Sequence, residues 1–306
     1  MKQTLSDLWQ RIEPRIFPAL PDNRRELGPW QFLLAFVTLT GFFAIMGLFL
    51  RPGGFMGYDW YHYYSRGIRE PFYPPWTPYV RFLTWPGLVG ASYAALTLAL
   101  YQRRASPVTM GLAFLSLPSL WLLFLGQVDG IVLLGLTGLP WLVPLATLKP
   151  QISAFAFLAR KDWTIALILW ILLTMLIWGL WPLDMLQYDE HWRAIYKVEK
   201  QASNIALWPW SLPIGVVLLW LSRGDMDMLM LAGSFVTPHL IPYNYFVILP
   251  ALARVNQFLS IALVAMSYLP LLSNWVGPWG WYSGHLFAFV LWIALYRQRC
   301  AWKGLA

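Results

Sequence analysis

Residues 123–130 read Leu123-Phe124-Leu125-Gly126-Gln127-Val128-Asp129-Gly130, and residues 147–151 read Thr147-Leu148-Lys149-Pro150-Gln151. Both stretches lie between apolar runs, so Asp129 and Lys149 belong to otherwise hydrophobic sequence. A charged group at the centre of a membrane-spanning helix costs roughly 2.5–3.5 kcal/mol on insertion scales. Chains that keep such groups usually use them for a substrate, an ion or a proton. We therefore expect the functional site in this region.

The composition around these stretches is that of a polytopic membrane protein. The chain of 306 residues is 58% hydrophobic and only 12% charged, whereas soluble domains carry about 25% charged residues. Its 20 Trp and 15 Tyr residues are typical of aromatic belts at membrane surfaces. Cys300 is the single cysteine, so no internal disulfide is expected. The net charge of +8 comes mostly from residues that flank apolar segments, which argues against a nucleic-acid partner.

Apolar runs long enough to cross a hydrocarbon core of about 30 Å predict an all-α bundle of transmembrane helices. The expected spans are 30–50, 82–101, 107–125, 163–183, 206–222, 256–272 and 282–296. Residues 1–28 precede them, and the helical spacing of apolar residues over 3–17 predicts an amphipathic helix on the membrane surface. No cleavable signal peptide is evident, so the first span is expected to be an uncleaved anchor. We expect 29–306 to form a single transmembrane domain.

Two further regions contain apolar segments that are too short to span. Prolines divide the first region into 130–139, 140–148 and 151–159, and the second into 226–237 and 243–253. A helix of ten residues covers about 15 Å, half of the core. Broken helices survive at membrane depth only when protein or a wet cavity surrounds them. We therefore expect short, broken or re-entrant helices around an internal site.

The Lys and Arg residues predict the orientation. With the N-terminus in the cytoplasm and 226–253 re-entrant, most positive charges fall inside, as the positive-inside rule requires: Lys2, Arg11, Arg15, Arg24, Arg25, Arg103, Arg104, Arg160, Lys161, Arg223, Arg254, Arg297, Arg299 and Lys303. Both termini are then cytoplasmic in a multi-pass protein of the plasma (inner) membrane. All four histidines, together with Asp59 and Asp129, fall on the outer side. For 130–148, one crossing and three short segments fit the rule equally well.

The first outer loop, 57–70, is an amphipathic, aromatic-rich segment that contains candidate catalytic side chains. If it is helical, Asp59, His62, Tyr63 and Arg66 share one face. A carboxylate beside His and Arg is suited to general base catalysis next to a phosphate-binding group. The alternative is that Asp59 caps a surface helix and the aromatic residues belong to the membrane belt.

The region 126–149 has a comparable pair of interpretations. Gln127 and Asp129 stand where an outward-running helix ends, and an amide beside a carboxylate is typical of sites that recognise sugar hydroxyls. The alternative is that Asp129 caps the next short helix. Lys149 would bind phosphate if it lies at membrane depth. Otherwise it would extend to the cytoplasmic surface, with 130–148 crossing once.

The second break contains His239 and Asn244 between prolines and aromatic residues. In one outer-facing turn these side chains would form a polar pocket, although a structural histidine is the commoner outcome. The outer loop 184–205 has Asp189 four residues before Arg193, a spacing typical of a solvated helix face. No metalloprotease, redox, serine-hydrolase or nucleotide-binding motif occurs. No cofactor is expected; Asp59 and Asp129 would permit a divalent metal without requiring one.

In order along the chain, these motifs resemble those of the GT-C integral-membrane glycosyltransferases, in particular the polyprenol-phosphate-mannose-dependent α-mannosyltransferases. The resemblance runs from about residue 30 to 255. It comprises Asp59 with Tyr63 and Tyr73-Pro74-Pro75, the turn Gly126 to Asp129, Lys149-Pro150, and Pro238-His239 with Tyr243. Each motif is short, and the resemblance rests on their order along the chain and on their common location at the outer side.

The resemblance implies an inverting hexosyltransferase that moves a sugar, mannose first, from a polyprenyl phosphate to a lipid or glycan acceptor on the outer face. Asp59 would then be the general base. The donor phosphate and sugar would be bound by Lys149, His239, Arg66, Arg69, Gln127, Asp129, His62 and Asn244. Two other classes stay open: a non-enzymatic transporter of lipid-linked substrates, and a catalytically silent membrane subunit of the same ancestry.

Overall fold

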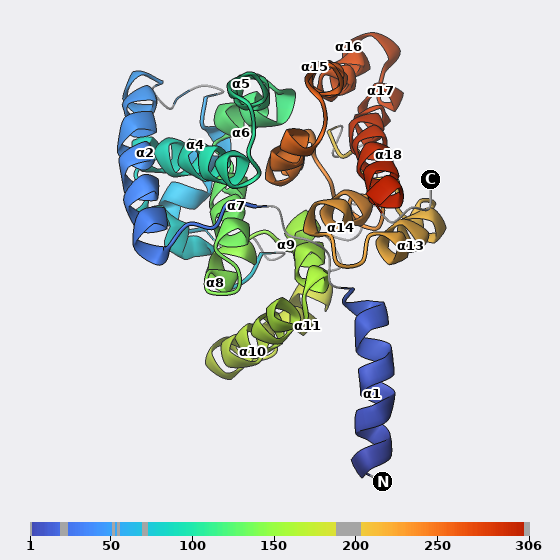
Figure 1. Cartoon of the computed structure of the whole chain (residues 1–306). Helices are drawn as coiled ribbons and strands as arrows, with labels where there is room; N and C mark the ends of the chain where they lie inside the picture. Colours follow the sequence, from blue (N-terminus) through green and yellow to red (C-terminus); the bar gives the residue numbers. More distant parts are fainter. Residues whose placement is uncertain are drawn as a thin grey trace.

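The computed structural model describes residues 2–18, 24–50, 53, 56–68, 73–187 and 203–302. These residues form helices, turns and coil; apart from an isolated bridge between Gly53 and Met56, they contain no β-structure. The prediction of an all-α chain is therefore confirmed for this part of the sequence (Figure 1).

In the described part of the chain, five helices have 15 to 21 residues: α1 (Lys2–Ile16), α2 (Pro29–Phe49), α4 (Trp85–Gln102), α10 (Lys161–Trp178) and α18 (Gly284–Trp302). The shorter α-helices are α3 (Tyr58–His62), α5 (Pro107–Phe114), α6 (Leu117–Leu125), α7 (Asp129–Thr137), α8 (Val143–Ala146), α9 (Pro150–Ser153), α11 (Trp181–Gln187), α13 (Leu212–Leu221), α14 (Met226–Gly233), α15 (Gln257–Ser267), α16 (Ser273–Val276) and α17 (Trp279–Tyr282). The 3-10 helices are η1 (Tyr64–Arg66), η2 (Thr77–Phe82), η3 (Ala154–Ala159), η5 (Pro242–Arg254) and η6 (Leu269–Leu272).

Several helical segments have the length and composition of membrane spans. Within the described residues, three are long and apolar enough to cross a bilayer: α2, α10 and the segment Gln257–Val276. The pair α5 and α6 becomes a fourth if the two helices, which meet at 46°, are counted as one span. The architecture is thus compatible with a helical membrane protein.

Three of the expected spans differ from the observed helices. The span 163–183 is divided, because α10 ends at Trp178 and Gly179 separates it from α11. The span 107–125 is bent because α6 starts afresh after Ser116, with Pro118 in its first turn, where proline removes a backbone donor. The span 206–222 yields only the ten residues of α13, which begins after turns that contain Pro209. Prolines therefore interrupt more of the bundle than the apolar runs alone indicate.

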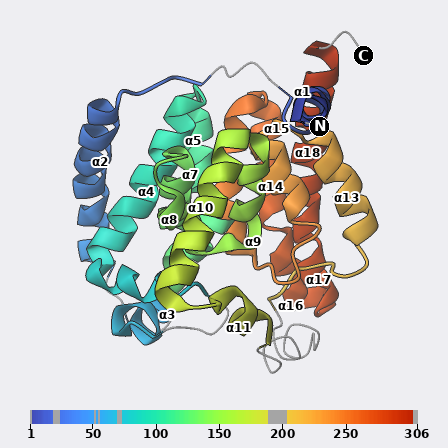
Figure 2. The same cartoon turned by 90° about the horizontal axis from the view of Figure 1, so that it is seen from below.

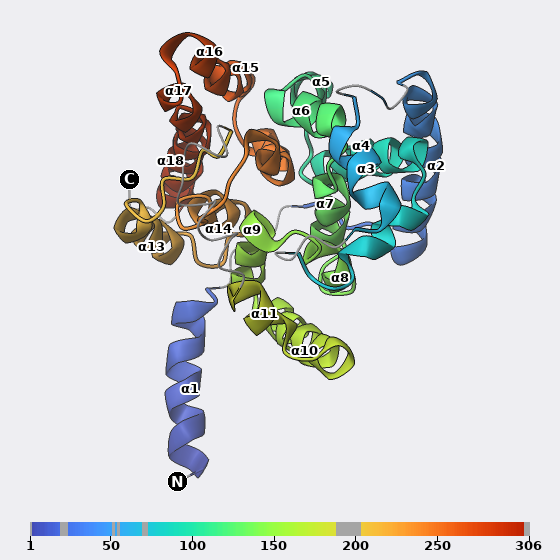
Figure 3. The same ribbon diagram turned by 180° about the vertical axis from the view of Figure 1, so that it is seen from behind.

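Apart from α1, the long helices run between two opposite edges of the molecule (Figure 2). Figure 2 shows α1 and the C-terminal end of α18 at one edge, here called the α1 edge, and α3, α11, α16 and α17 at the other, the α3 edge. In this view α1 is seen end-on, so its axis is perpendicular to α2 and α18. Figure 3 shows the molecule from the α3 edge, with α3 in front of α4.

Helix α4 forms the centre of one half of the core and packs against α2 and α7. Small residues permit these close approaches. A Cβ on Gly90 would lie 2.4 Å from the backbone oxygen of Thr40 in α2. A Cβ on Gly135 of α7 would lie 2.1 Å from the backbone nitrogen of Ala146 in α8. Both distances are far below van der Waals contact, so a larger residue at either position would push the helices apart.

Two pairs of short helices form buried hairpins whose two ends meet. Asp129, at the beginning of α7, forms an ion pair with Lys149, just after α8, at 2.9 Å. Asp225, which caps α14, pairs with Arg254 at the end of η5 at 2.7 Å. Each pair closes the base of a helical hairpin. A segment whose two ends meet in this way cannot cross a hydrocarbon core once, so the single-crossing interpretation of 130–148 does not fit the structure.

Candidate active site

The first loop brings Asp59 to the polar centre of the α3 edge. Gly57, with φ of +66°, precedes α3, and its backbone N–H donates to the Phe124 carbonyl at 2.6 Å, which fixes the loop against the end of α6. Asp59 lies in the first turn of α3 and is half-buried. Because Gly57 is the N-cap residue, the interpretation of Asp59 as a helix cap is wrong.

The expected continuous helical face of this loop is also wrong. Helix α3 ends at His62, and the chain tightens into η1 after Tyr63. The change of geometry buries Tyr64. His62 instead packs against Tyr58, with ring centroids 4.4 Å apart. Arg66 is exposed, and its guanidinium lies 5.6 Å from the Tyr61 ring.

Gln127 connects this loop to the interior. Helix α6 ends at Gly126, whose φ of +73° turns the chain, and the Gln127 side chain is buried behind Asp59. Its Oε1 accepts hydrogen bonds from Lys149 Nζ at 2.6 Å and from the Tyr64 hydroxyl at 3.2 Å. Because the Gln127 amide oxygen faces the two donors Lys149 and Tyr64, the amide nitrogen points the opposite way. There Nε2 donates to Asp59 Oδ2.

Lys149 continues the same chain of contacts inward. Its Nζ donates to Asp129 Oδ2 at 2.9 Å, and Asn244 Nδ2 donates to Asp129 Oδ1 at 2.9 Å. The five residues Asp59, Gln127, Lys149, Asp129 and Asn244 therefore form one connected network, here called the Asp59–Asn244 network. It joins four segments of the chain that are far apart in sequence.

The alternatives for Asp129 and Lys149 are both wrong in this structure. The Asp129 carboxylate forms no helix-capping hydrogen bond, because both of its oxygens bind side chains of the network. The Lys149 side chain is 2% exposed, so it does not extend to a surface. Its ammonium group also lies 4.2 Å from the Tyr243 ring and 5.9 Å from the Tyr73 ring, and both contacts favour the charged form.

His239 lies in the turn between α14 and η5 and is half-buried. The Thr237 hydroxyl in that turn donates to the Gln151 carbonyl at 2.7 Å, which attaches the turn to α9, two residues after Lys149. The two breaks predicted from the sequence are therefore adjacent in space. Arg69, Asp189 and Arg193 lie outside the described residues.

Buried tyrosines complete the surroundings, and Tyr64 is the one that sequence reasoning missed. Four tyrosines occur in 58–64, and nothing in their spacing distinguishes the one that turns inward. Burial raises the pKa values of Tyr64 and Tyr73. Both phenols therefore stay protonated at neutral pH and can act as hydrogen-bond donors.

Asp59 has the electrostatic properties of a base. Burial raises the pKa of its carboxyl above the ordinary value, while the positive charge of Lys149 and the hydrogen bond from Gln127 offset part of that increase. A base is most effective when its pKa approaches the working pH. Asp59 is also the half-buried end of the network, so a substrate hydroxyl can reach it more easily than Asp129, which is 3% exposed.

The residues available for a metal ion are few in the described part of the chain. No group of three or more His, Cys, Asp and Glu side chains is suitably placed there. Asp59 and Asp129, the two carboxylates that would permit a metal, accept hydrogen bonds from Gln127, Lys149 and Asn244. At Asp129, where both oxygens accept hydrogen bonds, a metal would compete with Lys149 and Asn244.

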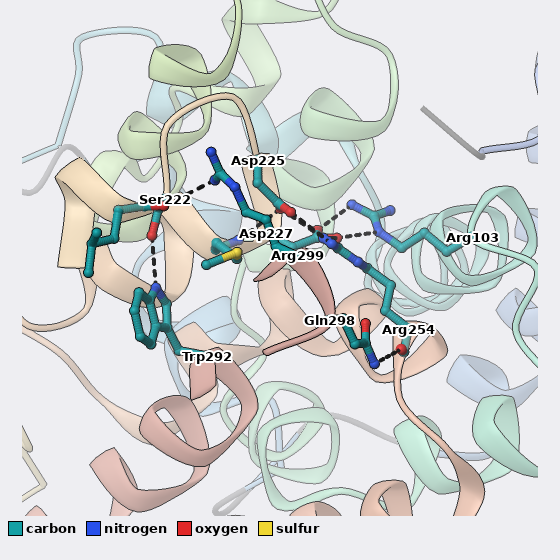
Figure 4. A network of polar contacts seen from close by, with 10 residues as sticks. Arg103, Ser222, Asp225, Asp227, Arg254, Trp292, Gln298 and Arg299 are labelled. Atoms are coloured by element: carbon teal, nitrogen blue, oxygen red, sulfur yellow. Dashed lines mark hydrogen bonds and ion pairs between the residues drawn. The ribbon is translucent and has the colours of Figure 1, made fainter. Parts of the chain in front are cut away.

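A second cluster of charges lies towards the α1 edge, where sequence reasoning expected only flanking cations. Arg103 pairs with Asp227 at 2.7 Å, and Arg254 pairs with Asp225 at 2.7 Å and with Asp227 at 3.1 Å (Figure 4). These four residues, here called the arginine–aspartate quartet, link the end of α4 to both ends of the α14–η5 hairpin. With two positive and two negative groups, the quartet is neutral and serves to hold the hairpin.

Comparison with known proteins adds no relative. No family model, characterised protein or solved structure matches this chain. The resemblance to GT-C glycosyltransferases therefore rests on the order of the sequence motifs.

Proposed function

We propose that this chain is a membrane glycosyltransferase that moves a hexose, with mannose the first candidate, from a polyprenyl-phosphate-linked donor to a lipid or glycan acceptor. Asp59 is the general base. The observation that carries the proposal is the Asp59–Asn244 network: it joins the half-buried Asp59 to a buried Lys149 at the meeting point of two interrupted helical regions. The motif order described above supplies the substrate class.

The proposed topology places the α1 edge in the cytoplasm and the α3 edge outside the plasma membrane. The basic residues of α1 and of the end of α18 favour this orientation through the positive-inside rule. Asp59 belongs to α3 and therefore faces the outer side, where donors attached to a polyprenol in the outer leaflet would be within reach.

The reaction that we propose is a single displacement. The acceptor hydroxyl oxygen attacks the anomeric carbon while Asp59 takes the hydroxyl proton. A new bond forms between that oxygen and the anomeric carbon, and the bond from the anomeric carbon to the phosphate oxygen breaks. Polyprenyl phosphate leaves with the electron pair of the broken bond, and the sugar is transferred with inversion. Cations near the leaving phosphate stabilise the charge that develops there.

The cations proposed to bind that phosphate fall into two groups, one near the α3 edge and one buried in the interior. His62 and Arg66 lie on the loop that carries Asp59, and Arg69 and His239 complete the proposed set. Lys149 lies deeper and already binds Gln127 and Asp129. A donor phosphate that reaches Lys149 could replace Gln127 Oε1 as a hydrogen-bond acceptor of its ammonium group. That exchange would free Gln127 to bind a sugar hydroxyl beside Asp129 and Asn244.

The proposal is tested by sugar transfer in liposomes. Purified protein is given radiolabelled polyprenyl-phosphate-mannose or polyprenyl-phosphate-glucose and a lipid extract of the cell envelope as acceptor. We expect labelled product with the wild type and none with Asp59→Asn. The matched control is Asp184→Asn, because Asp184 is an exposed carboxylate of α11 at the same edge. Transfer by Asp59→Asn at the wild-type rate would remove Asp59 as the base.

A second candidate function is transport of the lipid-linked substrate without chemistry. It is favoured by the Lys149–Asp129 pair, whose side chains are 2% and 4% exposed at the base of an interrupted helical hairpin. Such intramembrane pairs also occur in transporters and proton relays. Movement of an unmodified fluorescent polyprenyl-phosphate-sugar between leaflets, with no transfer product, would favour this function. Binding of the lipid with neither activity would indicate a silent subunit.

A further inference from the structure

The α1 edge contains two arginines that bind the same helix end. Arg223 Nε donates to the Trp220 carbonyl at 2.7 Å, and Arg299 Nη1 donates to the Leu221 carbonyl at 3.0 Å (Figure 4 shows Arg299). These consecutive carbonyls belong to the last turn of α13, so both guanidinium groups lie at its C-terminal end. The partial negative charge of a helix C-terminus stabilises cations, but it amounts to only about half an elementary charge.

No carboxylate in the described part of the chain neutralises these two arginines. Among the described residues, the aspartates of the quartet pair with Arg103 and Arg254, and neither Arg223 nor Arg299 forms an ion pair. Both are half-buried. Burial, and after it the positive charge of Arg299, lower the pKa of Arg223. Two neighbouring cations that have lost part of their hydration favour an anion between or beside them.

The C-terminal end of α13, where Arg223 and Arg299 bind, is here called the junction. Helix α1 also reaches the junction, and polar contacts near its C-terminal end attach it to the bundle. Arg223 Nη1 donates to the Arg15 carbonyl at 2.5 Å, and Lys161 pairs with Glu13 at 3.0 Å. The axis of α1 is perpendicular to the long helices, as an interfacial helix would lie (Figure 2). Leu8, Trp9 and Ile16 are exposed on it, at 53%, 42% and 37%.

We propose that the guanidinium groups of Arg223 and Arg299 bind the phosphate of an anionic phospholipid from the leaflet at the α1 edge, beside α1. The exposed apolar residues of α1 would contact its acyl chains. These residues favour a lipid over free phosphate, which has no apolar part to cover them. Clusters of basic residues at the cytoplasmic surface attract anionic headgroups. This binding site is separate from the Asp59–Asn244 network and does not depend on the proposed transferase activity.

The test is native mass spectrometry of the full chain in detergent, titrated with phosphatidylglycerol, phosphatidylcholine or inorganic phosphate. The junction variant is R223Q/R299Q. The matched control, R104Q/R297Q, removes the same charge from two exposed arginines. With about 1 kcal/mol for each basic residue near an anionic surface, the junction variant should bind phosphatidylglycerol about thirtyfold more weakly. The control should bind it as the wild type does.

Each result bears on the proposal. Retention of phosphatidylglycerol by the wild type in preference to phosphatidylcholine, lost only in the junction variant, supports it. Equal weakening in the control would show attraction by net charge alone and overturn it. Complete displacement of the lipid by inorganic phosphate would assign a free anion instead. If R223Q/R299Q does not fold, R223K/R299K keeps both charges and should retain the lipid. Equal retention of both lipids by the wild type would also refute the site.

Discussion

The Lys149–Asp129 pair gives the sharpest test of the interior. Its side chains are 2% and 4% exposed and the two charged atoms are 2.9 Å apart. Removing one partner from a buried pair leaves the other charge without compensation, which costs about 3–5 kcal/mol. In Lys149→Met, the Asp129 carboxylate keeps only its contact with Asn244, so we expect a loss of stability in that range.

A double-mutant cycle separates this effect from simple loss of packing. In K149M/D129N, the new amide can still accept the Asn244 hydrogen bond and carries no charge. The double variant should therefore be more stable than K149M alone. Unfolding with SDS in mixed micelles, followed by the fluorescence of the 20 Trp residues, measures each free energy of unfolding.

The control is a pair of the same chemistry at the surface. Arg160 and Asp162 are 3.0 Å apart with side chains 55% and 48% exposed, and exposed pairs contribute about 0–1 kcal/mol. Arg160→Met should thus cost less than about 1 kcal/mol. If K149M costs no more than R160M, or if the cycle shows no coupling between Lys149 and Asp129, the buried network described here is refuted.

Three further predictions concern other parts of the structure. Gln127→Leu removes the hydrogen bond to the charged form of Asp59 and so raises its pKa further; the acid limb of the transfer activity should move to higher pH, and an unchanged pH profile would contradict this. Gly135→Ala places a methyl group against the backbone of α8 and should cost about 1–3 kcal/mol, whereas Gly111→Ala, with open space around it, should not destabilise the fold in the same unfolding assay. Arg254→Gln leaves the buried carboxylate of Asp225 unpaired and should lower the free energy of unfolding by about 3–5 kcal/mol. If limited proteolysis finds the α14–η5 hairpin of this variant as protected as in the wild type, the quartet does not hold the hairpin.

Much of the backbone could be predicted because helix ends depend on local sequence. The expected segment 130–139 corresponds to α7, and 226–237 contains α14, since proline interrupts hydrogen bonding wherever it occurs. The spans at 30–50 and 82–101 correspond closely to α2 and α4. Where prediction failed, as in the bent span 107–125, the cause was a second helix start at Ser116 and Pro118 within a run that is otherwise apolar.

The side-chain network could be predicted only in part. The sequence indicates that Asp129 and Lys149 are functional because a charged group in apolar sequence is costly. Their pairing depends on tertiary structure, because the α7–α8 hairpin brings its two ends together. The quartet was not foreseen at all. Arg103 and Arg254 look like flanking cations in the sequence, and Asp225 and Asp227 gave no signal, because contacts between residues 27 to 124 positions apart are determined by tertiary packing.

The quartet also bears on how the chain is built into a membrane. All its charges belong to the ends of α4, α14 and η5, and the segment 228–253 between its aspartates and Arg254 contains His239 as its only residue that can carry a positive charge and no acidic residue. In the proposed topology, this segment enters and leaves the bilayer on the same side as a loop. No aspartate or arginine of the quartet would then have to be translocated, and pairing of Asp225 with Arg254 would close the loop at the side where it began.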